Sequence, residues 1–384
     1  MRFAKVTSSL RYDIDSFAGM PMTTPDFRLL VVRNDKLGDF MLSWPALKTL
    51  KHAHADIHVT VLVPEYTASI AHSCPWVDDV IIDPGHGASR AERRHLLNRM
   101  HDKQFDAMLT LFSTPRIGWL GWRAGIPVRM APATKWAQLF YNHRVLQRRS
   151  LSQKPEYEYN VDLALALLDH LNVQAEAARP PFWPMTERTH RQERLALANA
   201  CGLSLDRPWW CVHAGSGGSA VNLMPDRYAD LIEKVHAQLG RPVHWLFSAG
   251  PGEEHTADAL CKQLEANGID ARRLPACPRL STLAKTLGAT DGLIAGSTGP
   301  LHIAGCLNIA TVGFYPAKRS ATSLRWQTCN HEERRLAFSP PQGSDTDTNM
   351  ALIDLDAASH AIAELILRRG AYTDTHDVKS DHDD

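Results

Sequence analysis

Residues 291–305 have the sequence Asp-Gly-Leu-Ile-Ala-Gly-Ser-Thr-Gly-Pro-Leu-His-Ile-Ala-Gly, and the apolar run 309–314 follows shortly after. This order predicts a strand, a tight turn, a short helix with proline in its first turn, and a second strand. The hydroxyl of Ser297 or Thr298 is expected to cap the helix, and the glycines allow a ligand to approach the backbone. The free N–H groups at the helix start then favour a phosphate. A well-capped structural turn is the alternative.

The composition is typical of a soluble globular protein with two domains. The chain has 384 residues, more than one hydrophobic core usually serves. Its 42 basic side chains equal its 42 acidic ones, so no global field favours nucleic acid, and any electrostatic attraction must be local. Seven cysteines without a C-x-x-C pair indicate buried, reduced thiols. We expect a cytoplasmic protein without a signal peptide or a membrane-spanning segment, at most resting on a membrane.

Strands and helices alternate over residues 26–178, which predicts a first domain with a parallel sheet. Residues 1–25 carry no periodic signal and are interpreted as an N-terminal extension. Pro45 is expected to kink the first helix or to end its first turn. The expected strands are 27–33, 57–64, 77–82, 105–111 and 127–130, and the expected helices are 40–50, 88–103, 117–125 and 159–171.

Three prolines between 180 and 184 indicate an extended linker, which we place at 179–204. A second domain is predicted at 205–345, with strands at 209–214 and 243–248 and helices at 225–239, 253–268 and 281–287. An amphipathic helix within 346–369 is expected to return and pack on the first domain. The acidic tail 370–384 is expected to be disordered.

Several common motifs are absent from the sequence. There is no G-x-G-x-x-G, no P-loop and no H-E-x-x-H, and residues 217–221 lack the closing glycine of a nucleophile elbow. A simple dehydrogenase and an α/β-hydrolase are therefore disfavoured. No cofactor and no metal are predicted, although the 19 scattered histidines leave open a metal site that only folding would gather.

Three stretches in order resemble glycosyltransferase family 9, the ADP-heptose:lipopolysaccharide heptosyltransferases. They are Leu30-Val-Val-Arg-Asn-Asp-Lys-Leu-Gly-Asp39 with Pro45-Ala-Leu-Lys48, Cys211-Val-His-Ala-Gly215 with its glycine-rich loop, and Ser297-Thr-Gly-Pro-Leu-His302-Ile-Ala304. The resemblance implies a GT-B architecture, with two Rossmann-like domains facing across a cleft and a C-terminal helix crossing back to the first domain. It places the acceptor on the first domain and the nucleotide sugar on the second, and implies inverting transfer without a metal.

Inverting transfer needs a base for the acceptor hydroxyl and groups that stabilise the leaving diphosphate. Asp39 is the predicted catalytic base, because it follows the first strand, where α/β sheets present functional side chains. The alternative is that Asp39 only caps the next helix. The predicted donor-binding residues are Gly215, Ser216, Glu253, Ser297, Thr298, Gly299 and His302.

Two of these residues keep a second interpretation. By resemblance Glu253 faces the nucleotide ribose, whereas as a first-turn residue it would only complement the helix dipole. His302 is expected to donate to the diphosphate, or else to pack on its helix against Cys306.

The chain departs from the family pattern at two places. The family often has an acidic residue at the position of Ser297, and a lysine where this chain has Val221-Asn222. The cations that would replace that lysine are Lys318, Arg319 or Arg227, and the donor need not be ADP-heptose itself.

The predicted acceptor-binding residues are Arg144, Arg148 and Arg149, which would attract an anionic glycolipid or glycan, or the inner membrane surface. For the arginines within 90–99 a solvated helix face is an equal alternative. The leading hypothesis is an inverting, metal-independent transferase that moves a heptose or related sugar from a nucleotide-diphosphate donor, with ADP-heptose favoured, to a lipopolysaccharide core or similar glycan acceptor. A nucleotide-sugar epimerase of the same fold and a non-catalytic nucleotide-binding relative remain alternatives.

Overall fold

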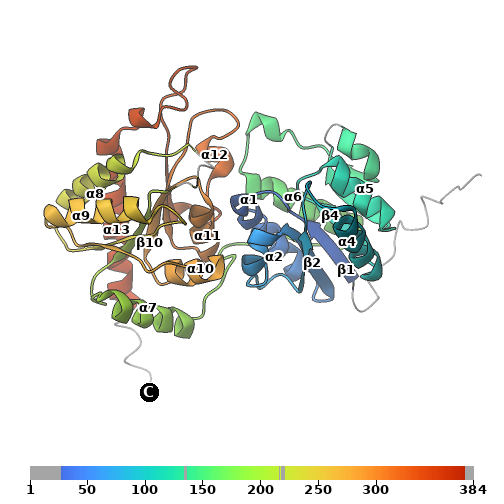
Figure 1. Cartoon of the computed structure of the whole chain (residues 1–384), viewed down its shortest axis with the longest axis horizontal. Coiled ribbons are helices and arrows are strands. Elements are labelled where there is room, and N and C mark those ends of the chain that lie inside the picture. The colour runs from blue at the N-terminus through green and yellow to red at the C-terminus, as the bar shows by residue number, and fades with distance from the viewer. Residues whose placement is uncertain (1–26, 134–135, 216, 218–220, 377–384) are drawn as a thin grey trace, which may run out of the picture.

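The computed structural model of the chain describes residues 27–133, 136–215, 217 and 221–376. It contains two six-stranded sheets, and each forms the centre of one domain (Figure 1). All ten strand pairings are parallel, and the central strands are buried on both faces, which explains their nearly continuous apolar sequences.

The first sheet has the strand order β3-β2-β1-β4-β5-β6. Its order reverses between β1 and β4, so the loops that follow these strands open a crevice at their carboxyl ends. The strands are β1 (Phe27–Val32), β2 (Ile57–Pro64), β3 (Asp79–Asp83), β4 (Ala107–Thr110), β5 (Val128–Pro132) and β6 (His143–Val145). The helices are α1 (Leu37–Met41), α2 (Trp44–Ala53), α3 (Ala68–Ala71), α4 (Arg90–Asp102), α5 (Pro115–Arg123) and α6 (Glu156–His170), with the 3-10 helices η2 (Glu65–Thr67), η3 (Trp136–Phe140) and η4 (Arg149–Leu151).

The second sheet repeats this arrangement in the order β12-β11-β10-β7-β8-β9, and its order reverses between β7 and β10. Its strands are β7 (Trp209–His213), β8 (His244–Phe247), β9 (Ala271–Arg273), β10 (Gly292–Gly296), β11 (Ala310–Phe314) and β12 (Arg335–Phe338). The helices are α7 (Glu187–Cys201), α8 (Pro225–Leu239), α9 (Glu254–Ala266), α10 (Leu280–Gly288), α11 (Gly299–Leu307), α12 (Ser323–Trp326) and α13 (Leu355–His376), with η5 (Glu332–Arg334) and η6 (Met350–Leu352). The strand-turn-helix-strand order predicted around residues 291–314 is confirmed by β10, α11 and β11.

Three differences from the predicted elements have simple causes. The helix expected at 40–50 is two helices, because Pro45 lies in the first turn of α2 rather than inside one helix. Helix α7 lies inside the segment predicted as a linker, and its charged sequence buries only Leu197 and Ala198. Helix α13 continues to His376, so residues 370–376 are helical rather than part of a tail.

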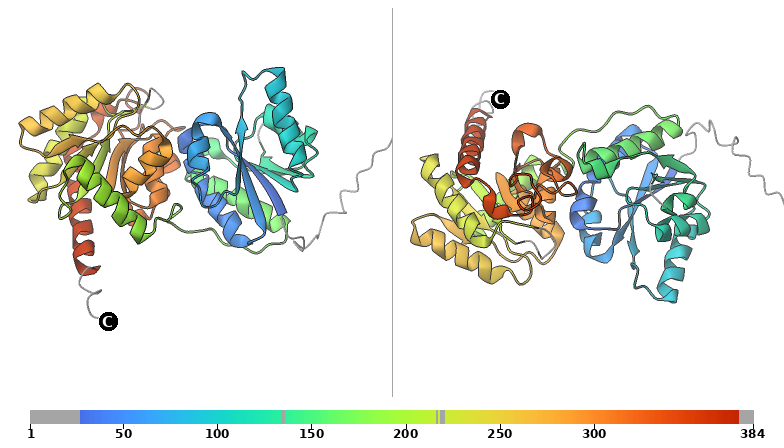
Figure 2. Two further views of the ribbon diagram at one scale, coloured as in Figure 1. Left: turned by 60° about the horizontal axis from the view of Figure 1, so that its bottom comes forward. Right: turned by 90° about the horizontal axis from the view of Figure 1, so that it is seen from above.

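The sequence analysis expected the C-terminal helix to return to the first domain, and this expectation is wrong. Helix α13 packs on α8 in the second domain, where Ile362 and Leu365 join the hydrophobic core (Figure 2). Ser359 accepts a hydrogen bond of 2.8 Å from Gln238 of α8. The apolar face of α13 is buried against its own domain, so it is not available to the first.

The two domains also share packing. Helix α1 lies against α11, and the backbone N–H groups of Phe182 and Trp183 in the connecting segment both donate to the carbonyl of Cys306, at 3.0 and 2.7 Å. The main core cluster therefore includes residues from both domains, such as Phe40 and Leu301. All seven cysteines are free, and five of them are buried, in agreement with the expected reduced thiols.

Candidate active site

A cleft of about 890 Å³ lies between the two domains. Its walls come from α1, from the loops after β7 and β8, from the turn between β10 and α11, and from the loop after β11. These segments follow strands at the points where both sheets reverse their order, which is where parallel sheets bind ligands. The cleft brings together six predicted site residues: Asp39, Glu253, Ser297, Thr298, Gly299 and His302.

Asp39 sits in α1 at the wall contributed by the first domain. Its Oδ1 atom accepts a hydrogen bond of 2.5 Å from Arg33, a buried arginine directly after β1. The residue preceding α1 at its N-cap is Lys36, so Asp39 is not the cap residue that the alternative interpretation required. The carboxylate is therefore held by one oriented contact and still lines the cleft.

Arg33 belongs to an ionic network that joins the two domains. Its guanidinium also contacts Asp35 at 2.8 Å and Glu156 of α6 at 3.3 Å. Glu156, whose side chain is 2% exposed, contacts Arg149 at 2.6 Å and Arg325 of α12 at 2.9 Å. The network thus pairs three guanidinium groups with three carboxylates, and Arg325 is its one member from the second domain.

Burial and charge act against each other in this network. Burial alone would raise the pKa of Glu156, but Arg149, Arg33 and Arg325 together lower it. For Asp35, burial raises the pKa to about 6, and the neighbouring Asp39 adds to the rise, although Arg33 opposes it. Removal of one charge would therefore leave an uncompensated ion in a desolvated place.

Arg149 was predicted to bind the acceptor, but the structure directs its guanidinium to Glu156 and Asn160. The other two predicted acceptor-binding residues, Arg144 and Arg148, are exposed on the first domain and do not line the cleft. The sequence could not show that Arg149 differs from Arg144 and Arg148, because only folding brings Glu156 and Asn160 of α6 to its guanidinium.

The turn between β10 and α11 lines the cleft, but two of its backbone amides already have partners: the N–H of Ser297 donates to the carbonyl of Phe314 at 3.1 Å, and that of Thr298 to the carbonyl of Gly296 at 2.7 Å. Thr298 is the N-cap residue of α11, as expected, but its hydroxyl donates to the carbonyl of Gly296 at 3.2 Å and makes no side-chain cap bond. The expected hydroxyl cap is therefore wrong. Pro300 in the first turn has no N–H, so the amides at the helix start are those of Gly299 and Leu301.

His302 is buried where α11 meets α1. Burial lowers its pKa to about 4, so the imidazole is neutral at physiological pH. A Cβ on Gly38 would come within 2.8 Å of its Cδ2 atom, and a Cβ on Gly299 would collide with Leu37. Glycine at both positions therefore lets α1 and α11 approach closely. The imidazole of His302 fills the space between the two helices, and part of this side chain also lines the cleft.

Glu253 connects the loops after β7 and β8. Its Oε1 accepts from the N–H of Gly217 and its Oε2 from the N–H of Gly250, both at 2.9 Å. A Cβ on Gly215 would collide with this carboxylate, so a larger residue there would displace Glu253 from its two backbone contacts. Glu253 is also the N-cap residue of α9, and a loop-organising role adds to the two interpretations that the sequence allowed. Ser216 lies outside the described residues.

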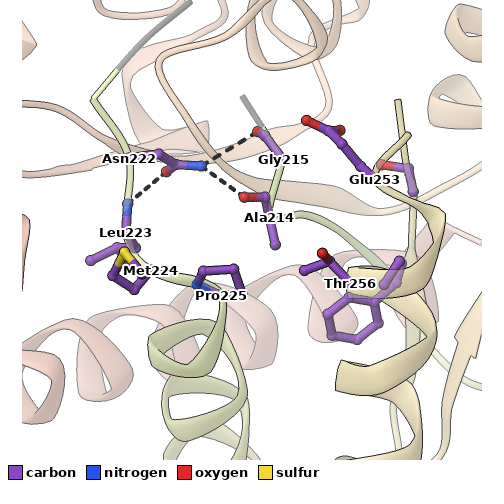
Figure 3. A pocket seen from close by; sticks show the side chains of 11 residues that line it. Ala214, Gly215, Asn222, Leu223, Met224, Pro225, Glu253 and Thr256 are labelled. Atoms are coloured by element: carbon purple, nitrogen blue, oxygen red, sulfur yellow. Dashed lines mark hydrogen bonds between the residues drawn. The ribbon is translucent and has the colours of Figure 1, made fainter. Parts of the chain in front are cut away.

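A smaller hollow of about 320 Å³ lies behind the glycine-rich loop (Figure 3). Asn222 holds its wall: Nδ2 donates to the carbonyl of Ala214 at 2.9 Å, and Oδ1 accepts from the N–H of Leu223 at 2.8 Å. Where the resemblance expected a lysine, the chain thus has a side chain that braces the loop and carries no charge.

Three cations were candidates to replace that lysine, and the structure distinguishes them. Lys318, in the loop after β11, lines the cleft. Arg227 donates instead to the carbonyls of Ala351 and Ile353, away from the cleft. Arg319 is absent from the cleft wall, and its carbonyl accepts from Ser152 at 2.6 Å.

Among the cleft-wall residues that the sequence analysis did not predict are two with polar contacts, His213 and Tyr66. His213 ends β7, and its Nδ1 lies 3.0 Å from the hydroxyl of Ser248. Tyr66 follows β2, and its hydroxyl donates to the carbonyl of Asp35 at 2.7 Å. His213 is the last residue of β7 and Tyr66 lies two residues beyond β2, so the rule that identified Asp39, which looks at the carboxyl ends of strands, would have found them.

Two negative findings apply to the described ranges only. Within them, no group of three or more His, Cys, Asp or Glu side chains is placed to hold a metal ion. Likewise, no helix in this part of the chain has both the length and the apolar character needed to cross a bilayer.

The two parallel sheets around a cleft form a GT-B architecture, and comparison with known proteins gives the family. Residues 93–335 match the model of glycosyltransferase family 9 (heptosyltransferase). A protein of Haemophilus influenzae described no further than as a glycosyltransferase is 42% identical over 343 residues, which cover 88% of this chain and 96% of that protein. The chain therefore belongs to glycosyltransferase family 9, as the resemblance implied.

More distant relatives agree with this assignment. Lipopolysaccharide heptosyltransferase 2 of Escherichia coli is 23% identical over 324 residues, or 80% of this chain and 90% of the relative. The structure of E. coli ADP-heptose lps heptosyltransferase II superimposes with a TM-score of 0.69 and 17% identity, covering 89% of this chain and 99% of that one. A family 9 structure from Veillonella parvula gives a TM-score of 0.74 at 16% identity, covering 91% and 100%. At these identities the structures show the shared fold.

Proposed function

We propose that this glycosyltransferase moves a heptose or related sugar, with inversion, from a nucleotide-diphosphate donor to a lipopolysaccharide core or similar glycolipid. The observation that carries the proposal is that Asp39 and the turn at Ser297–Gly299, which leads into α11, line one cleft from opposite domains. ADP-heptose is the proposed donor, since the related E. coli heptosyltransferase WaaC has been solved with ADP and with ADP-2-deoxy-2-fluoro heptose.

Asp39 takes the proton in the proposed reaction. The acceptor oxygen attacks the anomeric carbon from the side opposite the diphosphate, the bond from that carbon to the phosphate oxygen breaks, and the proton passes to the carboxylate. Arg33 binds Oδ1, which orients the carboxylate and leaves Oδ2 for the acceptor hydroxyl.

The second domain holds the donor in this proposal. The amide of Gly299 at the start of α11 receives the diphosphate, and Lys318 supplies the positive charge that the glycine-rich loop lacks. Gly215 and Glu253 shape the loops around the nucleotide, and the buried, neutral His302 fixes the angle at which α11 meets α1. In this proposal the negative charge of the leaving diphosphate is thus stabilised by groups of the protein.

The ionic network positions the base. Arg33 shares its guanidinium between Asp39 and Glu156, and Glu156 is held by Arg325 of the second domain. Docking of the second domain would therefore also set the geometry of Asp39.

The acceptor and the place of action complete the proposal. The first domain receives an anionic glycolipid, with Arg144 and Arg148 on its exposed surface attracting phosphate groups. The protein then works in the cytoplasm, peripheral to the inner membrane.

The decisive test is Asp39→Asn. The amide cannot accept the proton, so kcat is expected to fall by about 10²–10⁴-fold, while the donor Kd measured by calorimetry changes little. Asp162→Asn is the control, because Asp162 pairs with Lys154 and belongs neither to the ionic network nor to the cleft wall; the change in kcat is expected to stay below about threefold. Near-normal turnover of a folded Asp39→Asn protein would refute the assignment of the base.

The donor is tested by incubation with ADP-heptose, another ADP-sugar and a UDP-sugar, each with and without acceptor. Transfer that is fastest from ADP-heptose supports the proposal. Isomerisation of the donor alone would indicate an epimerase, and binding without turnover would indicate a non-catalytic relative; either result overturns it.

A further inference from the structure

The first domain exposes large apolar side chains on three segments: α5, η3 and the chain after β6. Trp119 and Trp122 are one helical turn apart on α5, and the latter is 54% exposed. Trp136 and Leu139 project from η3, with Trp136 79% exposed, and Leu146 follows β6 at 75% exposure. Exposed tryptophans in this number are not needed for the core and mark an interaction surface.

The elements that carry these side chains are neighbours. Helix α5 packs on η3, where a Cβ on Gly118 would lie 2.7 Å from the Cβ of Phe140. Strand β6 pairs with β5 at the edge of the sheet, next to η3. In Figure 1, α5 lies on the side of the first domain away from the second domain. The apolar side chains therefore belong to one region and not to the cleft.

The same region has an extreme local charge. Residues 107–155 contain eight Lys and Arg side chains and no Asp or Glu, although the whole chain is neutral. Four of the cations have partners: Arg116 pairs with Asp83, Arg149 with Glu156 and Lys154 with Asp162, while Arg129 donates to backbone carbonyls. Arg123, Arg144 and Arg148 are exposed and have no ion pair among the described residues.

We propose that this tryptophan-arginine face, made of α5, η3 and β6, docks the enzyme on an anionic lipid bilayer. Tryptophan rings prefer the boundary between headgroups and acyl chains, and exposed arginines are attracted to anionic headgroups. The segment that forms this face contributes no carboxylate over 49 residues, so its own charges are all of the sign that anionic headgroups attract. The inference deepens the proposed function, because a lipid-linked acceptor would be presented at that surface.

The binding test uses the full chain and vesicles of phosphatidylcholine with about 30% phosphatidylglycerol. A single cation near an anionic surface changes binding about fivefold, so Arg144→Glu with Arg148→Glu should weaken the partition coefficient by at least about 25-fold. Trp122→Ala with Trp136→Ala should also weaken it severalfold. The matched control is Arg90→Glu with Arg94→Glu on α4, which carries the same charge change on an exposed face without tryptophan, and should weaken binding less than threefold.

Thermal unfolding of each variant checks the fold, since all the replaced side chains are exposed. Three outcomes would overturn the proposal. The α4 control could lose as much vesicle binding as the Arg144/Arg148 variant, the tryptophan variant could bind as well as the wild type, or the wild type could bind pure phosphatidylcholine vesicles as well as the anionic ones. Capture of a soluble phosphorylated oligosaccharide by this face, without vesicle binding, would overturn it as well.

A transfer assay separates this inference from the proposed function. The tryptophan variant should lose turnover severalfold with acceptor in vesicles and keep it with the delipidated acceptor. If the variants lose vesicle binding as expected but the wild type transfers no sugar to either acceptor, the membrane face stands and the proposed function fails. If the wild type transfers sugar but the variants bind vesicles normally, the proposed function stands and the membrane face fails.

Discussion

The contact between α1 and α11 is neutral and tightly packed, whereas the contact between α6 and α12 is ionic, although both join the domains beside the same cleft. In the first, glycines at 38 and 299 allow the helices to meet around the uncharged His302. In the second, Glu156 forms ion pairs with Arg149 of its own domain and with Arg325 of the other domain. Asp39 is attached to both contacts, since α1 carries it and Arg33 binds it.

This difference shows two ways to fix a catalytic group between domains. The α1–α11 contact depends on shape, so a single added carbon disturbs it while salt should not. The ionic contact depends on charge balance, so an isosteric change that removes one charge disturbs it. Three predictions test the comparison.

The largest effect is expected for Glu156→Gln. The change preserves shape but leaves three guanidinium groups facing only two carboxylates, and loss of a buried partner costs about 3–5 kcal/mol. Urea denaturation should show this loss in the free energy of unfolding. Glu158→Gln, on the same helix and less buried, should cost about 0.5 kcal/mol or less. If both variants are equally stable, the network does not hold the domains.

The second effect is a pH dependence from His302. Its pKa is about 4 in the folded protein and about 6.5 when unfolded, so the unfolded chain binds more protons between these values and stability rises with pH. The contribution is fully present above pH 6.5 and is lost as the pH falls toward 4, on the order of 3 kcal/mol.

The matched measurement is the difference in unfolding free energy between wild type and His302→Gln from pH 4 to 7. The raised pKa of Asp35 acts with the opposite sign, because its contribution is lost as pH rises through about 6, but it is present in both proteins and cancels. A pH-independent difference would contradict burial of His302.

The smallest effect compares Gly38→Ala with Gly299→Ala. The new methyl at 38 meets the buried ring of His302, so the expected cost is about 1–3 kcal/mol even though alanine favours the helix. The methyl at 299 meets the end of a leucine side chain that can move, so its cost should be smaller.

A double-mutant cycle of Gly38→Ala with His302→Ala sharpens this prediction, because removal of the ring should relieve the cost at 38. Additive costs would mean that the two side chains do not meet. Raising NaCl from about 0.1 to 1 M should leave the glycine effects unchanged.

Much of the fold could be predicted from local patterns. Helix α8 begins and ends where its proline start and apolar period predicted, and the strand-turn-helix at β10 and α11 was found in the same way. The cleft position of Asp39 and Ser297–Gly299 was also predictable, because both follow strands and the carboxyl ends of parallel strands share one edge. The helix α7 was missed because its buried face is too small to give a strong period.

The partners of charged side chains were not predictable. Arg149 belonged to a basic run that suggested a ligand, but its partner Glu156 begins the next helix and is shared with Arg325, 169 residues further on. The packing partner of α13 was equally unpredictable. Its amphipathic period predicted a helix but not which domain its apolar face would cover.

The sequence by itself determined the strands, the turns that start helices, the glycines that permit close approach and, through its ordered motifs, the family. These depend on backbone preferences and on periods within a few residues. Only the tertiary structure decided that His302 is neutral and buried, that Lys318 alone of the three proposed cations lines the cleft, and that Arg33 links Asp39 to a network reaching the second domain. Those properties depend on desolvation and on distances between segments far apart in the chain, which a local pattern does not contain.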